Sequence, residues 1–62
     1  MESKDVKKWM GKKAIIILEG NIMYTGIIPD FEGTSFTLTD KFNEQVSIDC
    51  RNILFIRKWK IT

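Results

Sequence analysis

Short runs of apolar and polar residues alternate along most of the chain and predict strands. Residues 14–18 form a continuous apolar run rich in β-branched isoleucine, which favours a strand. Gly20 and Asn21 follow, and both tolerate the positive φ angles that a tight hairpin turn requires. A second apolar run, residues 22–28, therefore predicts the partner strand of a hairpin.

The second apolar run contains a glycine and ends at a proline. Gly26 predicts a sharp bend, as at the corner of a small closed sheet. Pro29 has no N–H to donate to a ladder, so pairing is expected to end or become one-sided there. Residues 29–33 then predict a turn or an irregular loop.

Three further strands are predicted downstream. Residues 35–39 and 45–49 alternate polar and apolar side chains, which is the pattern of half-buried strands. Residues 53–56 are apolar at every position and predict a strand that is covered on both faces. Residues 57–62 are expected to extend this last strand.

The first eleven residues predict a short helix. Ser3 is a suitable N-cap, and Val6, Trp9 and Met10 recur at helical spacing. Gly11 stands where such a helix would end. Because a helix of two turns at most is unstable alone, its three apolar residues are expected to pack against another part of the structure.

These elements predict one domain over residues 1–62, all-β with a short N-terminal α-helix. Residues 12–62 are expected to form a five-stranded, strongly bent antiparallel small barrel, because closure removes unpaired edges. A last strand that is apolar on both faces needs more cover than one small barrel gives, and a neighbouring subunit would supply it. The residues expected at this oligomer interface are Val46, Ile48, Leu54 and Ile56.

Chain length also favours self-association. A domain of 62 residues buries only about 60% of the surface that its unfolded chain exposes, so added disulfides, metal or self-association usually stabilise it. The single cysteine, Cys50, excludes an internal disulfide, and a chain without histidine offers no metal cluster. A homo-oligomer is therefore expected, with no metal and no cofactor.

Enzymatic activity is not predicted, because no nucleophile–base pairing is evident. Cys50 is expected to be a partly buried, unreactive thiol, since a reactive one would need a lowered pKa. The lone cysteine and the absence of a secretory leader predict a cytoplasmic protein. No uninterrupted apolar run exceeds five residues, so no membrane span and no membrane partner are expected. No small-molecule substrate is expected either.

Charge is unevenly distributed, although the net charge is only +2. Residues 1–13 and 51–62 are rich in lysine and arginine, whereas the residues between them are predominantly acidic. Identical dipolar subunits can pack head to tail. The alternative is that the lysines are ordinary solvated side chains at the two ends of the chain.

The order of helix, hairpin, bent strand and short final strand resembles the Sm-like (LSm) family of small β-barrels. The match covers nearly the whole chain and is specific only in its first half, where Asn21 stands at a family glycine position. The residues that carry it are Ile16, Leu18, Gly20, Asn21, Tyr24, Gly26, Phe31, Glu32, Phe36 and Leu38. The resemblance implies a ring of subunits joined by pairing of the fourth strand with the neighbour's fifth, and binding of single-stranded RNA.

The departures from the family lie at its RNA-binding positions. Ser35 stands where the family reads a base with asparagine, and the preceding Gly33 and Thr34 cannot stack on a base. Asp49 and Cys50 stand where the family carries Arg-Gly. The usual uridine pocket is therefore not expected.

Other residues remain candidates for RNA contact. By the family's geometry these include Phe31, Arg51 and Asn52, although Phe31 also suits a core anchor and Asn52 a turn. Residues 57–60 mix cations with Trp59, which suits single-stranded nucleic acid, but Trp59 can equally pack beside Trp9. The full set of candidate RNA-binding residues is Phe31, Ser35, Arg51, Asn52, Arg57, Lys58 and Lys60.

Two functional hypotheses follow from these patterns. The first is an Sm-like ring subunit that binds single-stranded RNA through basic and aromatic surfaces, without the usual uridine pocket. The second is a small barrel that serves as a protein–protein assembly module with no nucleic-acid ligand.

Overall fold

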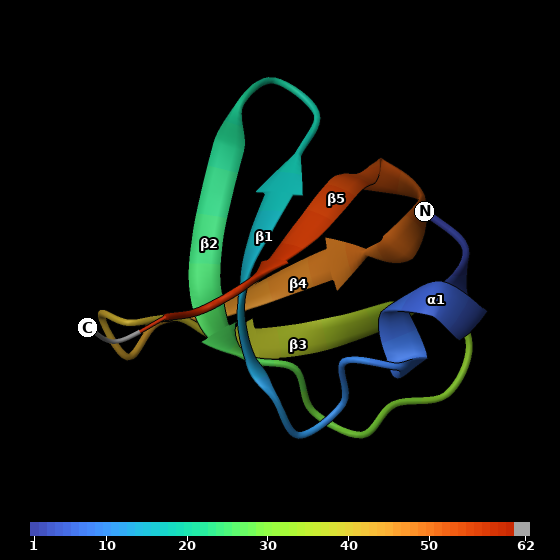
Figure 1. The fold of residues 1–62 in the computed structure, drawn as a ribbon, viewed down its shortest axis with the longest axis horizontal. Coiled ribbons are helices and arrows are strands. Elements are labelled where there is room, and N and C mark those ends of the chain that lie inside the picture. The colour runs from blue at the N-terminus through green and yellow to red at the C-terminus, as the bar shows by residue number, and fades with distance from the viewer. Residues whose placement is uncertain (61–62) are drawn as a thin grey trace.

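The computed structural model describes residues 1–60 and is mostly β, with one short N-terminal helix. This class is the one that the sequence predicts. The elements are α1 (Ser3–Lys7), β1 (Lys13–Leu18), β2 (Ile22–Ile27), β3 (Ser35–Thr39), β4 (Gln45–Asp49), the 3₁₀-helix η1 (Cys50–Asn52) and β5 (Ile53–Lys58), as Figure 1 shows. The predicted bounds of β3 and β4 are confirmed. β5 continues two residues beyond the predicted 53–56 and ends at Lys58, so the expected extension does not include residues 59 and 60. The end of that extension, residues 61–62, lies outside the described residues.

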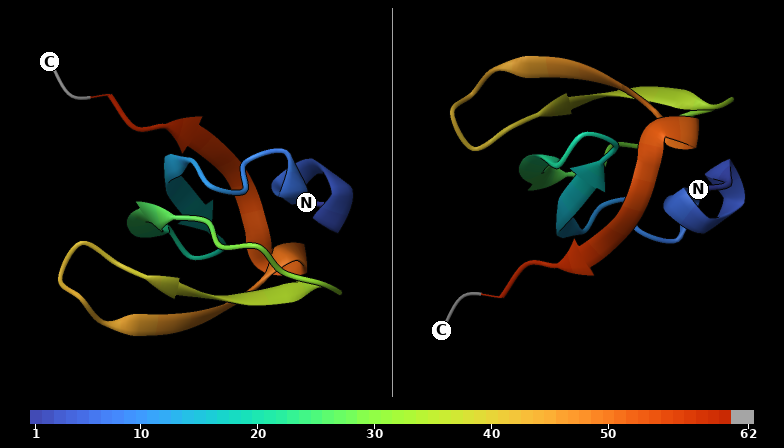
Figure 2. Two further views of the ribbon diagram at one scale, coloured as in Figure 1. Left: turned by 90° about the horizontal axis from the view of Figure 1, so that it is seen from below. Right: turned by 90° about the horizontal axis from the view of Figure 1, so that it is seen from above.

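The strands form two antiparallel sheets. β1 lies between β2 and β5 in a three-stranded sheet, and β3 pairs with β4 in a two-stranded sheet. Figure 2 shows the β3–β4 hairpin as one layer, with β1 and β5 in the layer that faces it. A single bridge between Gly26 and Asp40 joins β2 to the end of β3. The sequence of neighbours is therefore β5–β1–β2, then β3–β4.

A closed barrel, which the sequence analysis expects, is not found in the described part of the chain. β4 pairs only with β3 and β5 only with β1 within residues 1–60, so no ladder joins β4 to β5. The two strands that would close the sheet each keep one edge without a strand partner.

Gly20 and Gly26 have structural roles at the two positions where the sequence predicts that a glycine matters. Gly20 (φ +83°) and Asn21 (φ +61°) form the turn between β1 and β2 in the left-handed conformation that the sequence predicts. Gly26 lies where β2 meets β3, and a Cβ there would overlap the Thr39 carbonyl oxygen. Gly26 therefore permits the close approach of the two sheets.

The helix is shorter than predicted, and its N-cap is different. α1 has five residues, and its N-cap is Glu2, which makes no side-chain cap hydrogen bond, rather than Ser3. Val6 is fully buried, and Trp9 and Met10, just beyond the helix, pack against the core. α1 contacts η1 at the side of the molecule opposite the β3–β4 turn (Figure 1). Its apolar residues thus anchor it, as expected.

The core lies between the two sheets and under α1. It is formed by inward side chains of β1, β3, β4 and β5, together with Val6 of the helix, the loop residue Ile28 and Cys50 of η1. The buried residues are Val6, Ala14, Ile16, Ile28, Phe36, Leu38, Ile48, Cys50 and Ile53. Within residues 1–60 no helix is long and apolar enough to cross a bilayer.

Candidate assembly edges and nucleic-acid surface

β5 carries a register shift against β1. Leu18 is opposite Ile53 and Ile17 is opposite Phe55, so Leu54 has no partner in the described ladder. The shift changes the phase of the strand, because one extra residue moves the following side chains to the other face. Ile53 and Ile56 consequently face the core, and Phe55 is 48% exposed on the outer face.

The outer face of the three-stranded sheet is partly apolar. Directly opposite residues share a face, and Met23, Ile17 and Phe55 are aligned across β2, β1 and β5. Met23 is 63% exposed, and Ile17 is half-buried. The next row on this face contains Ile15 and Arg57, which are opposite each other on β1 and β5. This face therefore combines exposed apolar groups with a cation.

The residues expected at the oligomer interface have different environments. Ile48 is buried in the chain's own core, and Val46 and Ile56 are partly buried against it. Leu54 is 54% exposed at the register shift of β5. Leu54 is thus the member of this set whose side chain is most available to a neighbour.

Phe31 is half-buried and packs against the core. Its ring packs on Phe36 with the centroids 4.9 Å apart and an interplanar angle of 36°. The Nζ of Lys7 lies 5.6 Å from the centroid of the Phe31 ring. The core-anchor interpretation of Phe31 therefore accounts for its contacts.

Arg51 is paired with Asp49. Its Nη2 lies 2.9 Å from Asp49 Oδ2 and its Nε donates to Asp49 Oδ1 at 3.2 Å, while its backbone N–H donates to the same Oδ1 at 2.9 Å. These hydrogen bonds from Arg51 lower the pKa of the Asp49 carboxyl. Ser35 is exposed and lies opposite Asp49 in the β3–β4 ladder. The structure brings Ser35 and Arg51 together around Asp49, where the positive charge of Arg51 is neutralised.

The main chain of Asn52 connects η1 to the β1–β2 hairpin. Its carbonyl oxygen accepts the N–H of Glu19 at 3.0 Å, which ties the β1–β2 hairpin to the start of β5. The Asn52 side chain is exposed. This environment agrees with the turn interpretation.

The remaining candidates, Arg57, Lys58 and Lys60, lie together around Trp59. With Ile15 and Trp59 they line a hollow of about 500 Å³ beside the outer face of β5. The backbone N–H of Trp59 donates to the Lys13 carbonyl oxygen at 3.3 Å, so the chain stays paired with β1 one residue beyond the end of β5. The hollow is therefore lined by one aromatic, one apolar and three positively charged side chains.

A second hollow of about 530 Å³ lies next to the first. It is lined by Trp9, Lys12, Lys13, Lys58 and Trp59. The Lys13 Nζ lies 5.1 Å from the centroid of the Trp59 ring, within the range of a cation–π interaction. Sequence reasoning missed Lys12 and Lys13 as candidates, because only the pairing of the first strand with the last brings them to Trp59.

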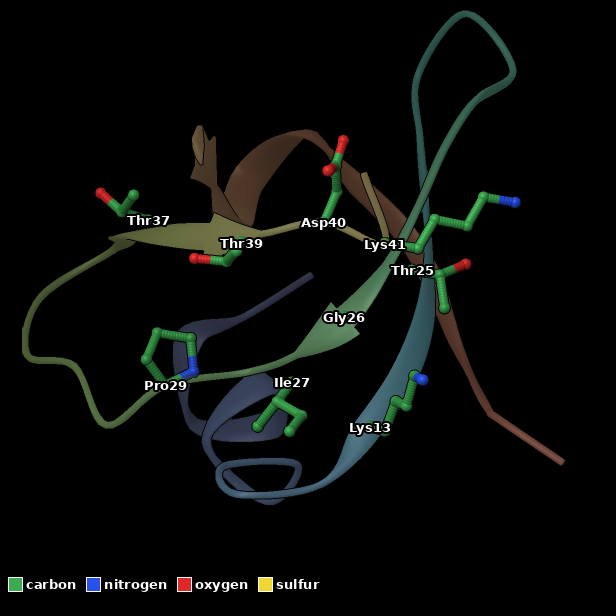
Figure 3. A pocket seen from close by; sticks show the side chains of 9 residues that line it. All are labelled: Lys13, Thr25, Gly26, Ile27, Pro29, Thr37, Thr39, Asp40 and Lys41. Atoms are coloured by element: carbon green, nitrogen blue, oxygen red, sulfur yellow. The ribbon is translucent and has the colours of Figure 1, made fainter. Parts of the chain in front are cut away.

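A third hollow lies where β2 meets β3. Figure 3 shows Lys13, Thr25 and Lys41 gathered at one side of it, with Thr39 and Asp40 at the adjoining edge. Its volume is about 400 Å³. Asp40 Oδ1 accepts the N–H groups of Phe42 and Glu44 at 2.9 Å each, so this carboxylate stabilises the β3–β4 turn.

Cys50 is a core residue. Burial raises the pKa of its thiol, and the negative charge of Asp49 raises it further. In residues 1–60 no three histidine, cysteine, aspartate or glutamate side chains are grouped to hold a metal ion. Cys50 thus lies in an environment that disfavours the thiolate.

Neither a protein-family model, nor a curated protein, nor a solved structure matches the chain.

Proposed function

We propose that the protein is an Sm-like subunit that assembles with further copies of itself into a ring and binds single-stranded RNA through a basic and aromatic surface. The observation that carries the proposal is the strand order, β5–β1–β2 followed by β3–β4 across the Gly26–Asp40 bridge. This order leaves β4 and β5 as the outermost strands. Their outer edges have no strand partner in residues 1–60.

Assembly follows from these two different edges. When β4 of one copy pairs with β5 of the next, the interface is heterologous, and repeated rotation closes it into a ring. The small barrel is then completed between chains rather than within one. Leu54, exposed beside the register shift, would be covered by the neighbour. Such burial supplies the stability that a small domain lacks.

RNA binding is proposed for the cations around Trp59, not for the loop positions used by the family for uridine. Arg51 is neutralised by Asp49, and Phe31 packs on Phe36, so neither offers a free phosphate or base contact. By contrast, the residues that line the two hollows beside Trp59 include five cations and no acid.

We also propose that the protein is cytoplasmic, because a lone cysteine in the core suits a reducing compartment.

The assembly half of the proposal is tested by the mass of the purified protein in solution, measured by light scattering. We expect a defined oligomer for the wild type. For Leu54→Lys we expect a lower mass in solution, because assembly would bury a charge at the interface between copies. Phe42→Lys is the matched control, since Phe42 is 74% exposed at the β3–β4 turn. Circular dichroism confirms that each variant is folded. A monomeric wild type contradicts the proposed assembly.

The RNA half is tested by filter binding of a short oligouridine and a short oligoadenosine at low and moderate salt. We expect binding to both that weakens as salt rises, because phosphate contacts release counterions. The ultraviolet absorbance of the purified protein reports any RNA that it carries. No retention of either RNA at low salt contradicts this half.

A second candidate function is a protein assembly module without a nucleic-acid ligand. The exposed apolar row of Met23, Ile17 and Phe55 favours it, because such a row suits a protein partner. A defined oligomer that neither carries nor binds RNA would support this candidate over the first.

A further inference from the structure

The outer face of β5 presents an aromatic, a cation and an aromatic in succession. The register shift at Leu54 places Phe55 opposite Ile17 and Arg57 opposite Ile15. Trp59 follows the last residue of β5 and continues the alternation, because its backbone N–H donates to the Lys13 carbonyl oxygen and so keeps the pairing with β1 in register. Alternate residues of a strand are about 6.8 Å apart. The face therefore offers two rings on either side of a guanidinium along one line.

Trp59 stands between two open hollows. The hollow of about 500 Å³ lies beside Ile15 and Arg57, and the hollow of about 530 Å³ lies beside Trp9 and Lys12. Trp59 lines both hollows. Each has room for a planar group against the indole, and Ile15 supplies an apolar floor to the first.

The positive charges here are available to a ligand. Arg57, Lys58 and Lys60 are exposed, as are Lys12 and Lys13. None of these five side chains has an ion-pair partner in the described part of the chain, where the ion pairs are Glu2–Lys4, Asp5–Lys8 and Asp49–Arg51. Aromatic faces interleaved with unpaired cations are the combination that binds single-stranded nucleic acid.

We propose that single-stranded RNA lies along the outer face of β5, with non-adjacent bases stacked on Phe55 and Trp59 and its phosphates held by Arg57 and the lysines beside Trp59. The inference rests on the proposed RNA binding and specifies where and how it occurs. Stacking accepts every base, so the site is sequence-tolerant and does not prefer uridine. It is distinct from the loop around Asp49 and Arg51.

This face stays open after assembly. Strand addition uses the edge of β5, whereas Phe55 and Trp59 project from its face. Charge complementarity selects a polyanion over a second copy of the chain, because the cations around Trp59 would repel the same surface of another subunit. The bound strand would run past each subunit of the assembly.

The test measures RNA affinity of the assembled full chain with the ring systems removed one at a time. Phe55→Leu and Trp59→Leu keep an apolar side chain and lose the aromatic face. The indole N–H of Trp59 has no acceptor among the described residues, so Trp59→Leu breaks no hydrogen bond of that group. Phe42→Leu is the matched control, because Phe42 is an exposed aromatic at the β3–β4 turn and does not line either hollow beside Trp59.

We expect each of Phe55→Leu and Trp59→Leu to weaken binding of oligouridine and oligoadenosine by about five-fold or more, and Phe42→Leu to leave it within about two-fold. Arg57→Gln should reduce the slope of log affinity against log salt by about one. Light scattering and circular dichroism establish that mass and fold are unchanged. If the wild type binds RNA and both leucine variants bind equally well, the stacking proposal is overturned while the proposed function stands. If the wild type binds neither RNA, the proposed function itself fails.

Fluorescence supplies a second measurement. In a Trp9→Phe background Trp59 is the sole tryptophan of the chain. We expect oligouridine and oligoadenosine to quench its emission, because a stacked base contacts the indole. Polyglutamate, which carries charge without bases, should not. Equal quenching by polyglutamate and RNA would show that charge alone drives the contact and would overturn the stacking proposal.

Discussion

Gly26 is the position where one added methyl group most directly tests the fold. It lies at the bridge between β2 and the end of β3, the bridge that joins the two sheets. A Cβ at this position would overlap the Thr39 carbonyl oxygen and would lie 3.2 Å from Cγ and Cδ1 of Leu38. Leu38 is fully buried, and the Thr39 oxygen belongs to the backbone. Neither group can turn away, so Gly26→Ala must separate β2 from β3.

The expected cost is large for so small a domain. Overpacking a core costs about 1–3 kcal/mol, and the upper half of that range applies because the overlapping atom is main chain. A domain of this length has a free energy of unfolding of about 3–9 kcal/mol. Since 1 kcal/mol shifts the Tm of such a domain by about 4–8 °C, we expect Gly26→Ala to lower it by about 10 °C or more.

Gly33 provides the matched control for this substitution. Its φ is +80°, and nothing lies within 4 Å of a Cβ placed there, so Gly33→Ala is costly only through its left-handed backbone, by about 1–2 kcal/mol. Asparagine tolerates that conformation, so Gly33→Asn should be more stable than Gly33→Ala. At Gly26 we expect the opposite order: Gly26→Asn should be less stable than Gly26→Ala, because the larger side chain worsens the overlap with the Thr39 carbonyl oxygen. Denaturant unfolding followed by circular dichroism gives the free energies. A Gly26→Ala protein as stable as wild type would refute the steric argument.

Three further predictions concern the core. Leu38→Ala should destabilise the fold by about 2–5 kcal/mol, measured by denaturant unfolding, because it empties a fully buried site between the sheets; a change below about 1 kcal/mol would contradict that packing. The buried Cys50 thiol should react with a disulfide reagent far more slowly in the native than in the denatured protein, and equal rates would contradict its burial. Burial, and secondly the negative charge of Asp49, raise the pKa of the Cys50 thiol in the folded protein above its ordinary value of about 9.0. The protonated thiol therefore contributes to the stability of the fold below pH 9.0, and this contribution is lost as the pH rises through the folded-state pKa. Cys50→Ala should remove that part of the alkaline loss of stability, and an unchanged pH profile would contradict the assignment.

The local elements could be predicted from the sequence because their signals are local. The bounds of β3 and β4 follow from strict alternation between turn residues, and the β1–β2 turn follows from Gly20 and Asn21. The glycine inside the second apolar run marks the position where β2 approaches the end of β3 closely, although the sequence predicts a bend there. Each of these signals requires only neighbouring residues, so single-sequence reasoning detects it.

The sequence predicts residues 57–60 as part of the candidate surface, but not Phe55, Lys12 or Lys13, because their places on it depend on long-range pairing and on one register shift. Residues 53–56 are apolar throughout, so their pattern does not reveal that Leu54 is left out of the ladder. Without that shift, Ile53 and Phe55 would share a face, and Ile53 could not be in the core while Phe55 is outside. Likewise, Lys13 meets Trp59 only because β1 pairs with β5. The turn chemistry of the chain does not specify that pairing.

The separation of edge and face leads to a prediction about RNA length. If the edges of β4 and β5 join copies while the outer face of β5 binds RNA, each added copy adds one binding surface to the assembly. A long RNA then engages several surfaces at once and gains avidity of about 10²–10⁴ over a single site, whereas a short oligonucleotide gains none.

Leu54→Lys tests this coupling, because Leu54 is exposed beside the edge and lies outside the row of Phe55, Arg57 and Trp59. In a folded monomeric variant, affinity for a short oligouridine should stay within about three-fold of wild type, while affinity for a long polyuridine should fall by more than ten-fold. Filter binding of both RNAs to the wild type and the variant supplies the comparison. An equal loss for short and long RNA would mean that one subunit does not hold a complete binding surface, and the strand would then have to cross the junction between copies.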